Sequence, residues 1–252
     1  MQVTQDLTGR RAVVTGAGRG LGYAIAHRLA QSGASITAID LAGALGAVPA
    51  QWTRFPVDLT APDAEQKLAE AAGAHQVIDI VVANAGLVPP WRSVEALVRD
   101  EWEQIMTLNV WAAAQTLGAF APCLARSDHA SAIVMASINS FSALPKQMLY
   151  TASKHAVIGV MRAAALDLGP QGVRVNALAP GPIATDALLS RLEARHRDGG
   201  LATEVALAEL ASGTALKRLA TAEDVANAAH FLASDASAGM TGSIIPVEAG
   251  LS

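Results

Sequence analysis

Short apolar runs alternate with longer alanine- and leucine-rich segments from one end of this chain to the other. Runs rich in β-branched residues and bounded by glycine, proline or polar residues are typical of buried strands. Seven such runs are present, at 10–15, 35–40, 52–57, 77–83, 131–136, 173–178 and 241–247. A helix between two strands returns the chain to the same edge of the sheet, so strict alternation favours parallel pairing. We therefore expect one α/β domain over residues 1–252, a doubly wound, seven-stranded, mostly parallel sheet with helices on both faces.

Composition excludes several classes of partner. The net charge is −4 and the 18 Lys and Arg residues form no basic run, which argues against nucleic acid, because phosphate binding needs a basic patch. The six histidines form no ligand-spaced cluster, so no metal site is expected. With Cys123 alone, no internal disulfide can form, and no signal peptide is visible at the N-terminus. These features favour a cytoplasmic protein.

One uncharged segment, 104–125, is long enough to cross a bilayer. It contains Gln104, Asn109, Gln115 and Pro122, however, and alanine dominates it. We interpret it as a helix buried on both sides in a protein that does not enter a membrane.

Glycines follow the first predicted strand in the pattern Thr15-Gly16-x-x-x-Gly20-x-Gly22. A glycine turn between a strand and a helix lets the backbone approach a pyrophosphate, whose charge then meets the helix N-terminus. A plain tight turn is the alternative. Asp40 ends the second predicted strand, where an acid can accept hydrogen bonds from an adenosine ribose and repel a 2′-phosphate. Arg19 would instead attract that phosphate, so Asp40 favours NAD and Arg19 favours NADP; we give Asp40 the greater weight.

Tyr150 and Lys154 lie four residues apart, and therefore on one face of a predicted helix. A nearby ammonium lowers the pKa of a phenol, which makes the phenol a general base near neutral pH. Ser137 ends the strand 131–136, at the edge of the sheet where α/β proteins meet ligands. By itself the pair is weak evidence, because Tyr-x-x-x-Lys occurs by chance in many helices and a surface lysine beside a half-buried tyrosine is the commoner explanation; the rest of the chain reverses that balance.

Three further positions have two interpretations each. Asp58 either contacts an adenine or caps the following helix. The segment 84–86 suits a chain close to a cofactor, or a turn. Asn109 stands among apolar residues in a helix, where it needs a partner, and a backbone group would suffice. The polar segment 186–216 suits a hinged lid over a pocket, or a solvated helical face.

Together, these motifs and their order make the chain resemble the short-chain dehydrogenase/reductase family over essentially its whole length, with a Rossmann-type fold. The residues that carry the resemblance are Gly16, Gly20, Gly22, Asp58, Asn84, Ala85, Gly86, Asn109, Ser137, Tyr150, Lys154, Pro180 and Gly181. The resemblance implies that Ser137, Tyr150, Lys154 and Asn109 are the catalytic group. It also implies that Lys154 holds the nicotinamide ribose, that Asn109 anchors a proton-relaying water, and that Ile183 and Thr185 hold the carboxamide.

The implied cofactor site is larger than its glycines. It comprises Gly16, Arg19, Gly20, Leu21, Gly22, Asp40, Asp58, Leu59, Asn84, Ala85, Gly86, Tyr150, Lys154, Pro180, Gly181, Ile183 and Thr185. Candidate substrate contacts are Trp91, Asn139, Leu144 and Gln147. Two stretches depart from the family pattern: Glu248-Ala249-Gly250 replaces the usual Asp-Gly-Gly, and Ile138-Asn139-Ser140 follows the serine.

The resulting expectation is an NAD-dependent oxidoreductase that transfers hydride between nicotinamide and a small secondary alcohol, polyol or sugar hydroxyl. An NADPH-dependent ketoreductase of the 3-oxoacyl-(acyl-carrier-protein) type is the alternative, and a non-catalytic NAD-binding sensor is a remote one. The predicted helices 100–125 and 150–169 are apolar nearly all round, more than one sheet face can cover. A four-helix contact between copies, as in the family, would cover the remainder, and we expect a homotetramer.

Overall fold

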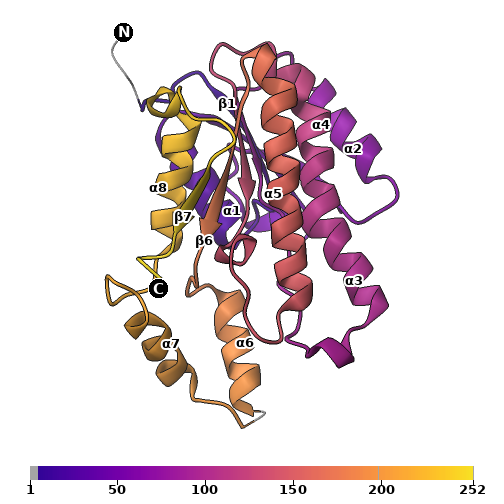
Figure 1. The fold of residues 1–252 in the computed structure, drawn as a ribbon. Helices are drawn as coiled ribbons and strands as arrows, with labels where there is room; N and C mark the ends of the chain where they lie inside the picture. The colour runs from indigo at the N-terminus through magenta and orange to yellow at the C-terminus, as the bar shows by residue number, and fades with distance from the viewer. Residues whose placement is uncertain (1–4, 198, 252) are drawn as a thin grey trace.

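The computed structural model describes residues 5–197 and 199–251 as a three-layer α/β domain. Seven strands form one sheet in the order β3-β2-β1-β4-β5-β6-β7. Their bounds are β1 Arg11–Thr15, β2 Ser35–Asp40, β3 Thr53–Pro56, β4 Ile80–Ala83, β5 Ser131–Met135, β6 Arg174–Pro180 and β7 Ile244–Val247. All six pairings are parallel. The expected fold is confirmed, with a sheet that is wholly parallel (Figure 1).

Helices cover both faces of the sheet because both faces are apolar. One face is covered by α1 (Gly20–Gln31) and α8 (Ala222–Ala233), the other by α2 (Ala64–Gly73), α4 (Ala112–Leu124) and α5 (Met148–Leu168) (Figure 1). Short 3-10 turns occur at Ala44–Ala47, Val94–Ala96, Ile138–Ser140, Gly169–Gln171 and Asp235–Ser237. The two cores meet only through the sheet, so the strands hold both helix layers in place.

The helix expected over 100–125 is divided into three parts. They are α3 (Arg99–Met106), a single π-helical turn (Thr107–Trp111) and α4. One extra residue in a turn shifts the helical register, and such turns occur frequently at functional sites. Asn109 lies in this turn. Within the described residues, no helix is long and apolar enough to cross a membrane.

Two helices, α6 (Asp186–Arg197) and α7 (Thr203–Ser212), extend beyond the carboxyl end of β6. In Figure 1 they lie below the sheet, away from the helices that cover its faces. Leu188 and Leu192 of α6 pack with Ala206 of α7 in a small apolar cluster separate from both main cores. The segment over 186–216 is therefore a helical pair with a core of its own, attached at one edge of the sheet.

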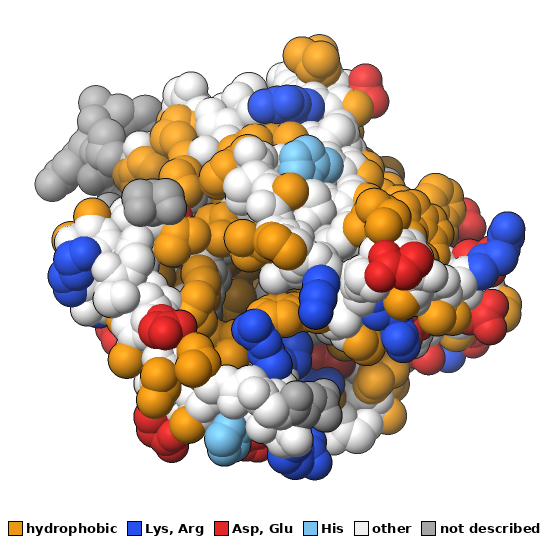
Figure 2. All heavy atoms as spheres, turned by 60° about the horizontal axis from the view of Figure 1, so that its bottom comes forward, with side chains coloured by type: hydrophobic (Ala, Val, Ile, Leu, Met, Phe, Trp, Pro, Cys, Tyr) orange, Lys and Arg blue, Asp and Glu red, His pale blue; other side chains and the backbone are white. Residues whose placement is uncertain are grey.

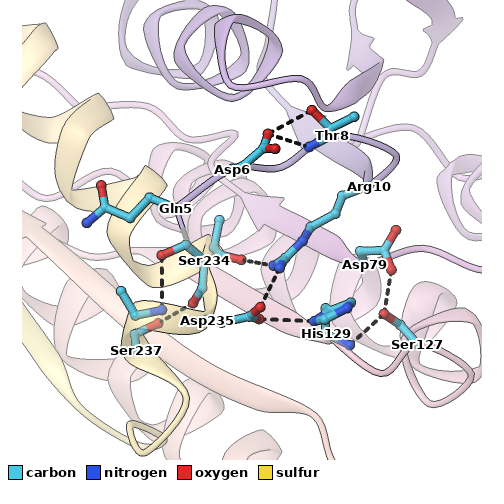
Figure 3. Close-up of polar contacts among 12 residues, drawn as sticks. Gln5, Asp6, Thr8, Arg10, Asp79, Ser127, His129, Ser234, Asp235 and Ser237 are labelled. Atoms are coloured by element: carbon cyan, nitrogen blue, oxygen red, sulfur yellow. Dashed lines mark hydrogen bonds and ion pairs between the residues drawn. The ribbon is translucent and has the colours of Figure 1, made fainter. Parts of the chain in front are cut away.

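A polar network closes the opposite, amino edge of the sheet (Figure 3). The buried Arg10 donates from Nη2 to Asp235 Oδ2 at 2.7 Å, and His129 Nδ1 lies 3.0 Å from Asp235 Oδ1. The His129 backbone amide donates to Ser127 Oγ, and that hydroxyl donates to Asp79 Oδ1. These residues precede β1, β4, β5 and β7, so the network joins chain segments that are far apart in sequence.

Candidate active site

The glycine loop after β1 has no room for side chains on its inner side. Gly16 and Gly20 have φ values of +67° and +57°, the left-handed region that favours glycine. A Cβ at Gly22 would lie 2.0 Å from the carbonyl oxygen of Gly16, whereas nothing lies within 4 Å of a Cβ at Gly20. The loop thus leads into α1 with bare backbone and open space on one side. That arrangement fits the pyrophosphate of a dinucleotide at the helix N-terminus.

Asp40 turns back toward this loop from the end of β2. Its Oδ2 accepts a hydrogen bond from the Gly18 amide at 2.8 Å, and its Oδ1 accepts one from the Leu41 amide at 2.8 Å. Arg19, beside Gly18, is exposed at the N-cap of α1. The carboxylate therefore lies within the glycine loop, as the sequence predicts.

Asn84 holds the start of the glycine loop through hydrogen bonds. Its side-chain amide donates to the carbonyl oxygens of Thr15 and Gly16, at 2.9 and 3.3 Å. Its backbone amide, like that of Ala85, donates to Thr15 Oγ1. The end of β4 is therefore fastened to the end of β1, which holds the loop in its conformation.

Asp58 caps the turn that precedes α2. Its Oδ1 accepts from the backbone amide and the hydroxyl of Thr60, at 2.9 and 2.6 Å. These hydrogen bonds stabilise the carboxylate form and hold the pKa of Asp58 below its usual value. Asp58 therefore closes a local turn with Thr60 and does not cap α2, whose N-cap is Asp63, and the contact with an adenine stays a prediction.

Ser137, Tyr150 and Lys154 meet at the carboxyl end of β5. The Ser137 side chain lies near the Tyr150 hydroxyl and favours the ionised form of the phenol. Lys154 Nζ lies 5.8 Å from the centroid of the Tyr150 ring and donates to the carbonyl oxygen of Met135 at 2.8 Å. Because β5 pairs with β4 at the centre of the sheet, this group lies near the segment 84–86.

The pKa of Tyr150 differs in direction from the sequence-based expectation. Burial raises it above its usual value, because a phenolate loses hydration, and the Ser137 hydrogen bond and the charge of Arg191 act in the opposite direction without reversing the shift. Burial also lowers the pKa of Lys154 to about 8. The expectation of a lowered Tyr150 pKa is wrong for the ligand-free protein, since burial outweighs the neighbouring charges.

Asn109 holds the loop that begins at Leu87. Its Oδ1 accepts from the Leu87 amide at 2.8 Å, and its Nδ2 donates to the Leu87 carbonyl oxygen at 2.8 Å and to Ser153 Oγ at 3.2 Å. Ser153 is adjacent to Lys154 on α5, so Asn109 joins the loop to the catalytic helix. Of the two interpretations of Asn109, the structure shows the one in which a backbone group satisfies its side chain.

The far side of the site is formed by the segment after β6 and the end of the chain. A Cβ at Gly181 would lie 2.7 Å from Glu248 Cβ, and Ile183 forms a backbone bridge with Ala220. Glu248 Oε2 accepts from the Gly250 amide in a turn of its own. The departure at Glu248-Ala249-Gly250 therefore lies against Gly181, at the predicted cofactor site.

The structure separates the four candidate substrate residues. Trp91 and Gln147 line one small cavity together with Tyr150. Asn139 is buried, and its Nδ2 donates to Gln147 Oε1 at 2.9 Å, so it orients Gln147. Leu144 lines a different hollow, beside Phe141, and does not join the Tyr150 cavity. Residues 141–146 are exposed, whereas Gln147, next to α5, is half-buried.

Two arginines of α6 were missed as site residues by the sequence analysis. The guanidinium of Arg195 lies over the Trp91 ring, 4.7 Å from its centroid. Arg191, one turn earlier, acts electrostatically on the Tyr150 hydroxyl. Figure 2 shows a hollow lined by apolar side chains on this side of the molecule, with Lys and Arg side chains along its rim. The four-residue spacing of the two arginines was the only signal in the sequence.

No group of three or more potential ligands for a metal ion occurs among the residues that the structure describes.

Comparison with known proteins agrees with this geometry. The family described as enoyl-(acyl carrier protein) reductase matches residues 16–252. The short-chain dehydrogenase/reductase astE of Aspergillus oryzae is 32% identical, over 98% of this chain and 96% of that protein.

Two solved structures have the same fold. Carveol dehydrogenase from Mycobacterium avium, in complex with NAD, is 30% identical with a TM-score of 0.89, covering 98% of this chain and 99% of that one. A putative gluconate 5-dehydrogenase from Beutenbergia cavernae, with bound NADP, is 31% identical with a TM-score of 0.85, covering 97% of each chain. Fold, site and relatives together show that the chain belongs to the short-chain dehydrogenase/reductase family and is an NAD(P)-dependent oxidoreductase that acts on CH–OH groups.

Proposed function

We propose that the protein is an NAD-dependent dehydrogenase for a small secondary alcohol, polyol or sugar hydroxyl. The observation that carries this proposal is the Tyr150 side chain, which lies beside Ser137 and Lys154 and lines a cavity with Trp91 and Gln147. A carbinol whose oxygen reaches the Tyr150 hydroxyl would meet a proton acceptor and the Ser137 hydroxyl together.

During oxidation, Tyr150 takes the hydroxyl proton of the substrate. Ser137 donates a hydrogen bond to the same oxygen and stabilises the charge that develops there. Tyr150 has to be in its phenolate form to take this proton; Ser137 and Arg191 favour that form against the effect of burial, and a protonated Lys154 beside the ring would act in the same direction. Asn109 holds the loop at Leu87 against α5, the helix that carries Tyr150 and Lys154. When bound, the nicotinamide supplies the hydride acceptor.

The preference for NAD rests on Asp40. Its carboxylate accepts from the Gly18 amide inside the glycine loop, where a 2′-phosphate would meet a like charge. The bare backbone of Gly16–Gly22, the Asp40 carboxylate and the segment from Pro180 to Thr185 would together hold the dinucleotide. We further propose that α6 and α7 form a lid over the substrate, since they share a core of their own.

A homotetramer is proposed on the exposed apolar side chains of the outer helices. Trp111 in the π turn is 56% exposed and Leu166 of α5 is 78% exposed. A contact between two copies of α4 and α5 would cover both. Location in the cytoplasm is proposed from the single cysteine alone.

The test follows the absorbance of reduced cofactor with the purified protein, NAD or NADP, and a panel of secondary alcohols, polyols and sugars at mildly alkaline pH. Turnover with NAD is expected, and Tyr150→Phe should lose nearly all of it while binding NAD as the wild type does. Turnover with NADP alone would overturn the NAD assignment and favour the reductase alternative. An unaffected Tyr150→Phe variant would contradict the assigned base.

A further inference from the structure

Arg191 of α6 has a buried side-chain nitrogen with no hydrogen-bond partner. Among the described residues, only two buried side-chain polar atoms are in this position, Arg191 Nε and the neutral amide oxygen of Gln115. Leaving a buried charged donor without a partner is costly, so native proteins rarely do so without a reason. The other buried cations of the domain are satisfied: Arg10 pairs with Asp235, and Lys154 donates to a backbone carbonyl. The Nε–H group of Arg191 is therefore a buried hydrogen-bond donor that lacks an acceptor.

The position of α6 brings Arg191 close to the catalytic Tyr150. The charge of Arg191 acts on the Tyr150 hydroxyl, and that of Arg195, one turn along the same helical face, lies over the Trp91 ring. Tyr150 and Trp91 line the same cavity. Hence the face of α6 that carries both arginines is turned toward the catalytic tyrosine.

No acidic side chain of the described residues neutralises this face. None of the ion pairs found there involves Arg191 or Arg195. Glu101, which lines the cavity, is already held by Arg92 through two hydrogen bonds of 2.7 and 2.6 Å. The face of α6 beside this cavity therefore carries positive charge without an ion-pair partner among the described residues, and such a charge attracts an anion.

We propose that Arg191 binds a carboxylate of the substrate, so that the alcohol oxidised at Tyr150 belongs to a hydroxy acid. This inference rests on the dehydrogenase function proposed above and specifies its substrate class. A planar guanidinium matches a carboxylate through two parallel hydrogen bonds. A phosphate, with about −1.5 to −2 charges, would need more donors than one free guanidinium. Because Arg195 of α6 lies over Trp91, which lines one cavity with Tyr150, the carboxylate would lie on the α6 side of the carbinol carbon.

The reaction then leaves the carboxylate unchanged. With NAD bound, the cofactor would accept the hydride of the carbinol C–H bond, the phenolate form of Tyr150 would take the O–H proton, and the hydroxy acid would become an oxo acid. Arg191 acts as a positioning residue for the substrate, because it holds the anion and takes no proton. Binding energy from the carboxylate fixes the carbinol oxygen between Ser137 and Tyr150.

The test compares 2-, 3- and 4-hydroxypentanoate with the matching carboxamides, using the wild type, Arg191→Leu, Arg191→Lys and Arg197→Leu with NAD. For at least one positional isomer, the wild type should prefer the carboxylate by about 10²-fold in kcat/KM, as expected for a desolvated charge pair. Arg191→Leu should bring this ratio close to one, and Arg191→Lys should keep part of it. Arg197 is exposed at the end of the same helix, so Arg197→Leu removes the same charge from α6 and should keep the ratio.

A wild-type enzyme that oxidises 2-pentanol and the carboxamides as well as the carboxylates would overturn the proposal and leave the dehydrogenase function intact. If nothing is oxidised, the dehydrogenase function is in question, and thermal shifts with NAD and the same compounds decide the inference. Stabilisation by carboxylates that is lost in Arg191→Leu supports the anion site. Equal shifts with carboxylates and carboxamides, or none, refute it.

Discussion

Asp40 at the end of β2 accepts a hydrogen bond from the Gly18 amide at 2.8 Å, so the acid and the glycine loop form one unit. The carboxylate is thereby held at the place where the adenosine half of a dinucleotide is expected. Its charge and its hydrogen bond can be separated by mutation, because an asparagine keeps an oxygen acceptor for Gly18 and loses the charge.

Asp40→Asn should raise kcat/KM with NADP by about 10- to 100-fold, which corresponds to the loss of about 1.4 to 2.8 kcal/mol of repulsion between two like charges near the protein surface. Steady-state kinetics with both cofactors measure the change. Asp63→Asn, which removes an exposed charge before α2, should leave the NAD-to-NADP ratio as it is. An unchanged ratio in Asp40→Asn would show that Asp40 does not select the cofactor.

The contact between Arg195 and Trp91 joins α6 to the loop that follows β4. Trp91→Leu removes the aromatic face under the guanidinium, a contact worth about 0.5 to 2 kcal/mol. The variant should show several-fold faster hydrogen exchange in α6 and a several-fold higher substrate KM at nearly constant kcat. Trp91→Phe keeps an aromatic ring, so its exchange rate and its substrate KM should lie between those of the wild type and Trp91→Leu. Equal hydrogen-exchange rates of α6 in the wild type, Trp91→Leu and Trp91→Phe would show that the contact between Arg195 and Trp91 does not hold α6 in place.

Ala249 adopts a left-handed backbone conformation, with φ of +59°. That conformation costs an L-residue about 1 to 2 kcal/mol, and glycine avoids the cost but loses more entropy on folding. Ala249→Gly should therefore raise the free energy of unfolding by up to about 1 kcal/mol. Gly250→Ala should lower it, because φ there is +77° and the new Cβ would lie 2.6 Å from Ala215 Cβ. Urea unfolding of both variants tests this, and a destabilised Ala249→Gly would contradict it.

Burial of Lys154 gives the protein a pH-dependent stability. Its pKa is about 8 in the folded protein and 10.5 in the reference state, so between these values the unfolded chain binds more protons. This contribution is fully present above the reference pKa and is lost as the pH falls through the folded pKa. Between about pH 7 and 10, the wild type should therefore gain stability relative to Lys154→Met. Thermal unfolding of both proteins over that range measures the difference, and parallel curves would refute the shifted pKa.

The alternation of strands and helices, the glycine loop and the Tyr150–Lys154 pair could all be predicted from the sequence. Each depends on residues close in the chain, where strand and helix periodicities set which side chains share a face. The position of Asp40 also followed, because parallel strands bring their carboxyl ends to one edge. The bounds of β2 agree with the expected 35–40, whereas β4 and β7 each begin three residues later than the expected 77 and 241.

Tertiary structure decided how distant segments meet. The π turn around Asn109, the support of the glycine loop by Asn84 and the removal of Leu144 from the Tyr150 cavity all depend on packing between elements. So do the raised pKa of Tyr150 and the unpartnered nitrogen of Arg191, because burial is a property of the folded whole. The sequence alone determined which groups carry out the chemistry, through local patterns. Only the tertiary structure decided their charge states and which side chain of α6 faces them, because desolvation and long-range contacts arise when the layers pack.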